Sequence, residues 1–398
     1  MRIGYMCIGT EVLIGDTLNT NGNYLAGMLS NIGLKLSYEI SVSDNKDDIG
    51  KSLDFILSDV DILIVSGGLG PTEDDMTKEY ISELTGISLI EDLEHIEWMQ
   101  KRWKQRGAQM PELNRKQAQI YENFEGIRNT TGTALGAELR YMDTDIYLLP
   151  GPPREFKPMV DEYLINKISN KSVNKKLKYK YITLYGIPES TLAEGINTFK
   201  PQDMEIAYLP KYGVIKLRYD KNSIQKSEED SFLNKLNNLY QENIVSYSND
   251  SLETTLYNKM TNSETTLSIV ESITGGKLSG IITSVPGSSN VFFSSEILYQ
   301  NSAKAKFLDL ATIPKDWNIL SRLLSEKLLI KADTSISLAV LGEAGPINSS
   351  EYKVGEVFIA VANNIKTEVE RYKFVGNRED ITNQTINQCL FNLIKWID

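Results

Sequence analysis

The hydrophobic positions of the first 165 residues alternate between short continuous runs and runs spaced three or four residues apart. Continuous runs at 3–8 and 60–66 are typical of buried strands. The spacing at 20–32 and 47–57 predicts amphipathic helices between such strands. Because strands that alternate with helices favour a mostly parallel sheet, we expect an α/β domain over residues 1–165.

The pattern changes after residue 165 and returns near residue 267. Four patterned segments predict a small α/β middle domain over residues 166–250: strand-like runs at 181–185, 205–209 and 214–219, and a helix-compatible run at 223–242. From residue 267 strand and helix patterns alternate again, and an amphipathic helix is expected over 378–397. We therefore expect a third α/β domain over residues 251–398.

Composition narrows the class of protein. The 398 residues are 41% hydrophobic and carry a formal net charge of −11, which argues against binding to a nucleic-acid backbone. The longest apolar runs are strand-sized and the first five residues lack a long apolar stretch, so neither a membrane span nor a secretory signal is expected. Only two cysteines occur, Cys7 and Cys389, which indicates a reducing compartment. We expect a cytoplasmic protein.

A single histidine, His95, restricts the possible chemistry further. It lies in a segment with helical periodicity, where a structural or exposed histidine is expected. Zinc sites built from Cys and His are disfavoured, and any metal should be held by carboxylates, which favours Mg²⁺, Mn²⁺ or a similar ion. A serine nucleophile would need a base other than histidine, and lysine is the obvious substitute.

A glycine-rich turn at 66–77 is the strongest local signal. A buried strand ends in glycines whose N–H groups can approach a phosphate, and the following helix N-terminus favours anions. Asp74 and Asp75 are expected in the first turn of that helix, where they either cap it or reach a divalent ion. Turns at 9–16 and 150–155 also follow strands. Because the carboxyl ends of parallel strands share one sheet edge, the three turns predict one site.

These turns also carry a family resemblance. The matching residues are Gly9-Thr10-Glu11, Thr20-Asn21, Asp44-Asn45, Gly67 to Thr72 with Asp74-Asp75 and Thr77, Asn114 with Gln117-Ala118, Gly132-Thr133-Ala134, and Pro150 to Pro153 with Glu155. They resemble the amino-terminal half of the CinA (competence/damage-inducible) family, which is similar to the three-layer α/β fold of MoaB and MogA. The resemblance implies metal-dependent hydrolysis of ADP-ribose to AMP and ribose 5-phosphate.

Site residues follow from this resemblance and from the turns. In the domain 1–165, called the front domain below, the expected substrate-binding residues are Thr10, Asn21, Gly67, Gly68, Gly70, Thr72 and Gly151. We infer the metal ligands, in falling order, as Asp74, Asp75, Glu11 and Glu155.

The rest of the chain resembles the other parts of the same family. Residues 186–190 are similar to its small KH-like connecting domain. The carboxy-terminal match is carried by Glu271-Ser272, Thr274-Gly275-Gly276, Pro286 to Ser289, Tyr299 with Asn301 and Lys304, Ala344-Gly345-Pro346 and Val354-Gly355. It implies deamidation of nicotinamide mononucleotide without a cofactor, and a homodimer. By that resemblance Ser289 is the nucleophile, with Tyr299 and Lys304 its activating partners.

In the domain 251–398, called the rear domain below, substrate contacts are expected from five residues: Ser272, Thr274, Gly275, Gly276 and Gly345. The three residues 274–276 should start a helix and suit the nucleotide phosphate. The chain departs from the family at Ile273, where Cys is usual, at Glu343, where a small or aliphatic residue is usual, and at 347–350, where glycines are usual. Glu343 would repel an anionic substrate unless it is paired.

Three alternatives stay open at this point. The rear domain could be a degenerate binding or scaffold module behind an active front domain. The chain could be a non-enzymatic competence- or repair-associated protein, or it could handle molybdopterin. The Asp74-Asp75 pair with Pro71 and the attached rear domain favour the CinA resemblance over the last of these.

Overall fold

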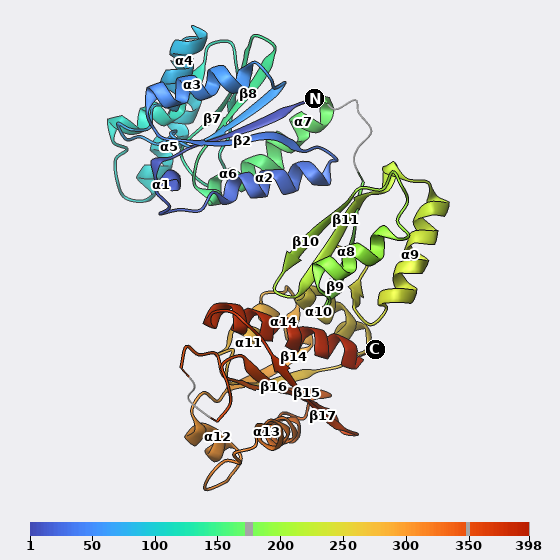
Figure 1. Cartoon of the computed structure of the whole chain (residues 1–398). Helices are drawn as coiled ribbons and strands as arrows, with labels where there is room; N and C mark the ends of the chain where they lie inside the picture. The colour runs from blue at the N-terminus through green and yellow to red at the C-terminus, as the bar shows by residue number, and fades with distance from the viewer. Residues whose placement is uncertain (172–177, 348–350, 398) are drawn as a thin grey trace. The chain divides into compact units, whose positions relative to one another are not determined.

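The computed structural model describes residues 1–171, 178–347 and 351–397. The chain forms two compact units, Met1–Lys178 and Tyr179–Asp398, and each is described by itself (Figure 1). The unusual residues 348–350 lie outside the described residues. No helix in the described ranges is long and apolar enough to cross a membrane.

The first unit is built on a six-stranded sheet of order β2-β1-β3-β8-β7-β6. Its strands are β1 (Ile3–Ile8), β2 (Leu36–Val42), β3 (Ile62–Ser66), β6 (Gly126–Ile127), β7 (Gly136–Tyr141) and β8 (Thr144–Leu149). Strands β1, β2, β3 and β8 run parallel to one another, whereas β7 is antiparallel to both of its neighbours, β8 and β6. The expected mostly parallel sheet is therefore confirmed, with an antiparallel edge.

Helices cover both faces of this sheet (Figure 1). They are α1 (Thr10–Leu13), α2 (Thr20–Asn31), α3 (Lys46–Leu57), α4 (Thr77–Thr85), α5 (Leu93–Gln105), α6 (Pro153–Met159) and α7 (Ile165–Lys171), with a small ribbon of β4 (Leu89–Glu91) and β5 (Gln119–Tyr121). Successive residues of a strand point to opposite faces, so Met6 and Ile8 pack with α3 whereas Tyr5 and Cys7 pack with α2 and α6. The result is the expected three-layer α/β arrangement.

The second unit contains two sheets. The four-stranded antiparallel sheet has the order β10-β11-β9-β12, with β9 (Tyr179–Tyr185), β10 (Ile206–Lys211), β11 (Val214–Asp220) and β12 (Ile244–Ser246). Helices α8 (Glu189–Asn197) and α9 (Lys226–Tyr240) share its hydrophobic core through Leu192, Ile196, Phe232 and Leu236.

The five-stranded sheet has the order β14-β13-β15-β16-β17. Its strands are β13 (Leu267–Glu271), β14 (Phe292–Ile297), β15 (Ile336–Gly342), β16 (Glu356–Ala362) and β17 (Thr367–Lys373). The helices around it are α10 (Leu252–Asn262), α11 (Lys277–Thr283), α12 (Asn301–Phe307), α13 (Trp317–Ala332) and α14 (Arg378–Ile397). The predicted strand 3–8 and helix 378–397 agree with β1 and α14, whereas α13 was not predicted.

Candidate functional site

Three strand ends meet in the first unit, because β1, β3 and β8 are parallel neighbours. Gly67, just after β3, has φ +109°, and a Cβ there would collide with the carbonyl oxygen of Ile8 at the end of β1. Its N–H donates to the carbonyl of Leu149 at the end of β8, with N and O 3.1 Å apart. Only glycine fits this approach, so the expected convergence of the three turns is confirmed.

Asn21 ties the same strand ends together from the first turn of α2. Its side-chain Nδ2 donates to the carbonyl of Gly151 over 2.7 Å and to Oγ of Ser66 over 3.3 Å. Its Oδ1 is buried and has no hydrogen-bond partner among the described residues. A buried acceptor without a donor costs about 1–3 kcal/mol, so a polar group of a ligand would relieve that cost.

The glycine-rich turn differs from its prediction at the two aspartates. Helix α4 begins at Thr77, so Asp74 and Asp75 lie in the turn before it rather than in its first turn. Oδ2 of Asp75 accepts from the N–H of Thr72 over 3.1 Å and from the Thr72 hydroxyl. Asp75 therefore stabilises the turn. Asp74 is exposed, and hydrogen bonding from Thr72 lowers the pKa of its carboxyl.

Three further residues predicted for this site, Thr10, Glu155 and Glu11, also contact other residues of the chain. Both the N–H and the hydroxyl of Thr10 donate to Asp44, over 2.8 and 2.9 Å. The buried carboxylate of Glu155 accepts from Nδ2 of Asn129 over 2.7 Å, and Glu11 folds back over Gly9.

The four carboxylates do not fit a resident metal site. In the described part of the chain, no group of three or more His, Cys, Asp or Glu side chains could hold a metal ion. Asp75 and Glu155 are held by Thr72 and Asn129, as described above. These carboxylates therefore do not form a resident metal site within the described residues.

A pocket of about 350 Å³ opens at the carboxyl ends of β13 and β15 in the second unit. It is lined by Ser272, Ile273, Tyr299, Asn301, Lys304, Trp317, Leu341 to Gly345, Ile347 and Arg378. Two of the three expected catalytic residues, Tyr299 and Lys304, share this pocket with Ser272.

Lys304 is the buried base candidate. Only 5% of the residue is exposed, and burial lowers the pKa of its ammonium to about 8. Its Nζ donates to the carbonyl of Tyr299 over 3.0 Å, which fixes the amine at the pocket wall. Ser272, which follows β13, is buried beside the same pocket.

Ser289 is not among the residues that line this pocket. It lies in a short 3₁₀ turn (Ser288–Asn290) and its side chain is exposed. Ser289 therefore does not line the pocket that contains Tyr299 and Lys304. The structure places Ser272, which was expected to contact substrate, beside Tyr299 and Lys304 instead.

The expected phosphate position at the start of α11 is occupied by the chain itself. The carboxylate of Glu271 is fully buried and accepts from the N–H groups of Gly276, Leu278 and Ser279 over 2.8, 3.2 and 2.8 Å. The Ser279 hydroxyl donates to it as well. The N–H groups of Gly276, Leu278 and Ser279 are therefore not available to an anion, whereas the buried hydroxyl of Thr274 has no hydrogen-bond partner among the described residues.

Sequence reasoning missed Arg378, which brings a cation to the pocket from the first residue of α14. Its Nη1 donates to the carbonyl of Gly345 and its Nη2 to the hydroxyl of Tyr299, each over 2.7 Å. Glu343 is buried in the same pocket. The pocket therefore contains the cation of Arg378 as well as Glu343, whose carboxylate was expected to repel an anionic substrate.

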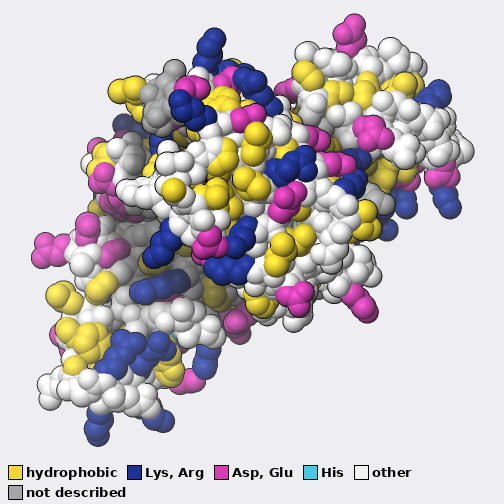
Figure 2. Space-filling view, turned by 90° about the horizontal axis from the view of Figure 1, so that it is seen from below, with side chains coloured by type: hydrophobic (Ala, Val, Ile, Leu, Met, Phe, Trp, Pro, Cys, Tyr) yellow, Lys and Arg dark blue, Asp and Glu magenta, His cyan; other side chains and the backbone are white. Residues whose placement is uncertain are grey.

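The surroundings of His95 are those of a structural histidine, as expected from the sequence. His95 is buried, its Nε2 lies 3.0 Å from the carbonyl of Thr133, and burial lowers its pKa. On the face shown in Figure 2, acidic and basic side chains are interspersed, so the net charge is not gathered in one patch there.

Comparison with known proteins adds family relationships. Residues 4–170 match the family described as probable molybdopterin binding domain, and residues 249–397 match the CinA C-terminal domain. A putative competence-damage inducible protein of Caldicellulosiruptor saccharolyticus is 34% identical, with 95% of each chain covered. A CinA-like protein of Flavobacterium psychrophilum is 32% identical, covering 100% of this chain and 99% of its own.

Solved structures cover part of the chain. The crystal structure of the protein CinA with unknown function from Thermoplasma acidophilum matches 42% of this chain and 99% of its own, with 28% identity and a TM-score of 0.39. A competence or damage-inducible protein from Enterobacter asburiae matches 37% of this chain and 96% of its own, with 22% identity and a TM-score of 0.35.

Proposed function

This chain belongs to the CinA family, and on that premise we propose that it hydrolyses two substrates of the pyridine-nucleotide cycle. Family membership supports a nucleotide-processing role in general. The finer proposal is that the second unit deamidates nicotinamide mononucleotide and that the first unit cleaves ADP-ribose. The observation that carries it is the pocket in which Ser272, Tyr299 and Lys304 come together.

In the deamidation, Ser272 acts as the nucleophile and Lys304 as its base. A neutral amine can take the proton of the Ser272 hydroxyl as its oxygen attacks the carboxamide carbon, and burial of Lys304 makes the neutral form accessible near pH 8. The same proton then passes to the departing ammonia. Water, deprotonated by Lys304, then attacks the resulting ester, and the proton passes from Lys304 to the departing Ser272 oxygen as the pyridine carboxylate is released.

Tyr299 and Arg378 position the substrate in this proposal. The Tyr299 hydroxyl is held by Arg378 and can donate its own proton to the oxyanion that forms at the carboxamide. The guanidinium of Arg378 is suited to a phosphomonoester, because its donors match phosphate geometry. This places the phosphate at α14 rather than at the start of α11, where Glu271 already accepts the N–H groups.

For the first unit, the close-packed strand ends and Asn21 carry the proposal. Gly68, which also has a positive φ, can turn its N–H toward a diphosphate, whereas the N–H of Gly67 donates to Leu149. Oδ1 of Asn21, which has no hydrogen-bond partner in the described part of the chain, lies at the same strand ends and can accept from a ribose hydroxyl. Asp74 is an exposed carboxylate of the turn and is available to an ion that arrives with the substrate.

The two activities are tested separately on the purified full chain. Ammonia release from nicotinamide mononucleotide tests the second unit, and AMP release from ADP-ribose tests the first. A chain that releases neither product, with both substrates at millimolar concentration, contradicts the proposal and favours the binding or scaffold role.

A further inference from the structure

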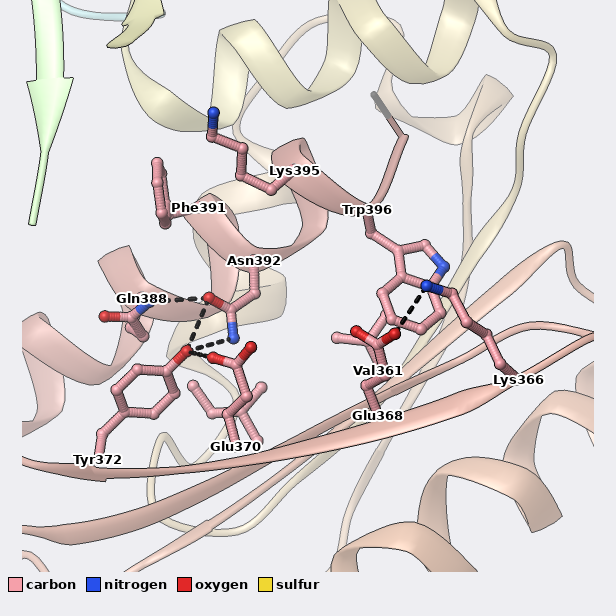
Figure 3. A pocket seen from close by; sticks show the side chains of 11 residues that line it. Val361, Lys366, Glu368, Glu370, Tyr372, Gln388, Phe391, Asn392, Lys395 and Trp396 are labelled. Atoms are coloured by element: carbon pink, nitrogen blue, oxygen red, sulfur yellow. Dashed lines mark hydrogen bonds and ion pairs between the residues drawn. The ribbon is translucent and has the colours of Figure 1, made fainter. Parts of the chain in front are cut away.

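A second cavity of the unit Tyr179–Asp398 has about 400 Å³ and lies between β17 and the last turns of α14 (Figure 3). Its floor is apolar, formed by the buried Ile359 and Val361 of β16. Arg378 lies at the opposite end of α14 and lines the pocket of Ser272 instead. The second cavity is therefore separate from the proposed catalytic pocket.

One side of this cavity already binds an ammonium group that belongs to the chain. Nζ of Lys366 lies 4.5 Å from the ring centroid of Trp396 and donates to Oε1 of Glu368 over 2.7 Å. Figure 3 shows Lys366 and Glu368 beside the indole. An aromatic face combined with a carboxylate is the chemistry that recognises an organic cation.

The other side of the cavity offers a second carboxylate without a cation. Glu370 is bonded by the neutral hydroxyl of Tyr372, and no ion pair joins it to Lys or Arg within the described ranges. Lys395, the other cation that lines the cavity, lies 3.9 Å from Glu242 instead. The exposed carboxylate of Glu370 therefore lines the cavity without a cationic partner among the described residues.

The backbone spacing of Glu368 and Glu370 suggests the length of a ligand. The two residues are two positions apart on β17, so their side chains lie on one face and their Cα atoms are about 6.7 Å apart along the strand. Two ammonium groups joined by four or five carbons are roughly 6 to 7.5 Å apart when extended, with bonds of about 1.5 Å. The apolar chain between them would lie on Val361.

We propose that this cavity binds a small alkyl diammonium, with one ammonium on Glu370 and the other competing with Lys366 for Glu368 and Trp396. Lys366 is in this view an internal competitor of the ligand. The proposal does not rest on either hydrolytic activity.

The test is isothermal titration calorimetry of the full chain with 1,5-diaminopentane. Wild type should bind one equivalent, and Glu370→Gln, which keeps an acceptor for Tyr372, should weaken binding about tenfold or more, since a charge-assisted hydrogen bond is lost. Lys366→Met should strengthen binding, because the competing ammonium is removed. A purely structural role of Lys366 would not produce this gain.

Glu296→Gln is the matched control. Glu296 lies on β14, at the opposite edge of the same sheet, and forms an ion pair with Lys331 of α13. It should bind the diamine as wild type does. Absence of binding to wild type, equal binding by Glu370→Gln, or weaker binding by Lys366→Met overturns the proposal. Equal affinity for pentan-1-amine would overturn the contact of the second ammonium.

Discussion

Nη2 of Arg378 and the hydroxyl oxygen of Tyr299 lie 2.7 Å apart, joining two residues that are 79 positions apart in the chain. The bond brings the first residue of α14 to the turn before α12. It leaves the guanidinium at the mouth of a pocket that also contains Lys304 and Ser272.

Replacing Arg378 by Met should raise KM for nicotinamide mononucleotide at least about tenfold, because a charge-assisted contact to the phosphate is lost. The corresponding riboside lacks the phosphate, so its much smaller kcat/KM should change little. Ammonia release from both substrates measures the difference. Tyr299→Phe is the control: it removes the bond to Arg378 but keeps the cation, so it should lower kcat without raising KM. Equal losses with nucleotide and riboside would show that Arg378 does not bind phosphate.

Ser272→Ala should reduce ammonia release by roughly 10³-fold or more, since loss of a nucleophile removes the covalent step. Ser289→Ala should retain activity, because Ser289 is exposed and does not line the pocket. The two alanine variants should have the same thermal unfolding midpoint within a few degrees. The reverse pattern of activities would restore Ser289 as the nucleophile.

The deamidation rate should rise with pH and level off above about pH 8, because Lys304 must be neutral to accept a proton and burial lowers its pKa to about 8. Below that value kcat/KM should fall about tenfold per pH unit, as the neutral fraction falls. A profile of kcat/KM from pH 6 to 9.5 measures this. Lys304→Arg should be inactive across the range because arginine stays charged. A rate that is flat from pH 6 to 9 would contradict the role of Lys304 as base.

Asp74→Asn should lower AMP release from ADP-ribose at least about tenfold, because it removes the exposed carboxylate of the glycine-rich turn that is proposed to contact the ion. Asp47→Asn, at an exposed carboxylate in the first turn of α3, is the matched control and should have wild-type activity. Activity should also stop on addition of a chelator and return with excess Mg²⁺. AMP release that persists in chelator would contradict the entry of an ion with the substrate.

Lys78 should make the stability of the first unit depend on pH. Burial lowers its pKa to about 7, although its Nζ donates to the carbonyls of Gln119 and Leu135 over 2.7 and 2.8 Å. Between pH 7 and about 10.5 the unfolded chain retains a proton that the folded chain has lost, so this group makes the free energy of unfolding rise with pH.

The comparison variant for this effect is Lys78→Met. It should lose the rise with pH and cost about 1–3 kcal/mol at pH 9, since buried carbonyls lose their donor. Urea unfolding of both proteins at pH 6.5, 7.5 and 9 measures the difference. Parallel stability curves would show that Lys78 does not titrate in this range.

The local hydrophobic pattern was sufficient to predict most helices and strands, and the meeting of the strand ends in the first unit. Residues 3–8 form a strand in which every residue is buried, and a continuous apolar run reports such burial directly. Helix α13 escaped prediction although it packs against β15 and β16 through Leu320, Leu324 and Leu328. Its hydrophobic residues were not recognised as a helical pattern in the sequence.

The sequence by itself determined the α/β architecture, the glycine turns and the pairing of Tyr299 with Lys304 across one turn, because these depend on neighbours within one or two elements. Only the tertiary structure decided that Ser272 rather than Ser289 joins them and that Arg378 enters the pocket. It also decided that Glu271 fills the start of α11. Those choices depend on strand order and on how α14 packs, contacts between residues that are far apart in the chain and that no local periodicity encodes.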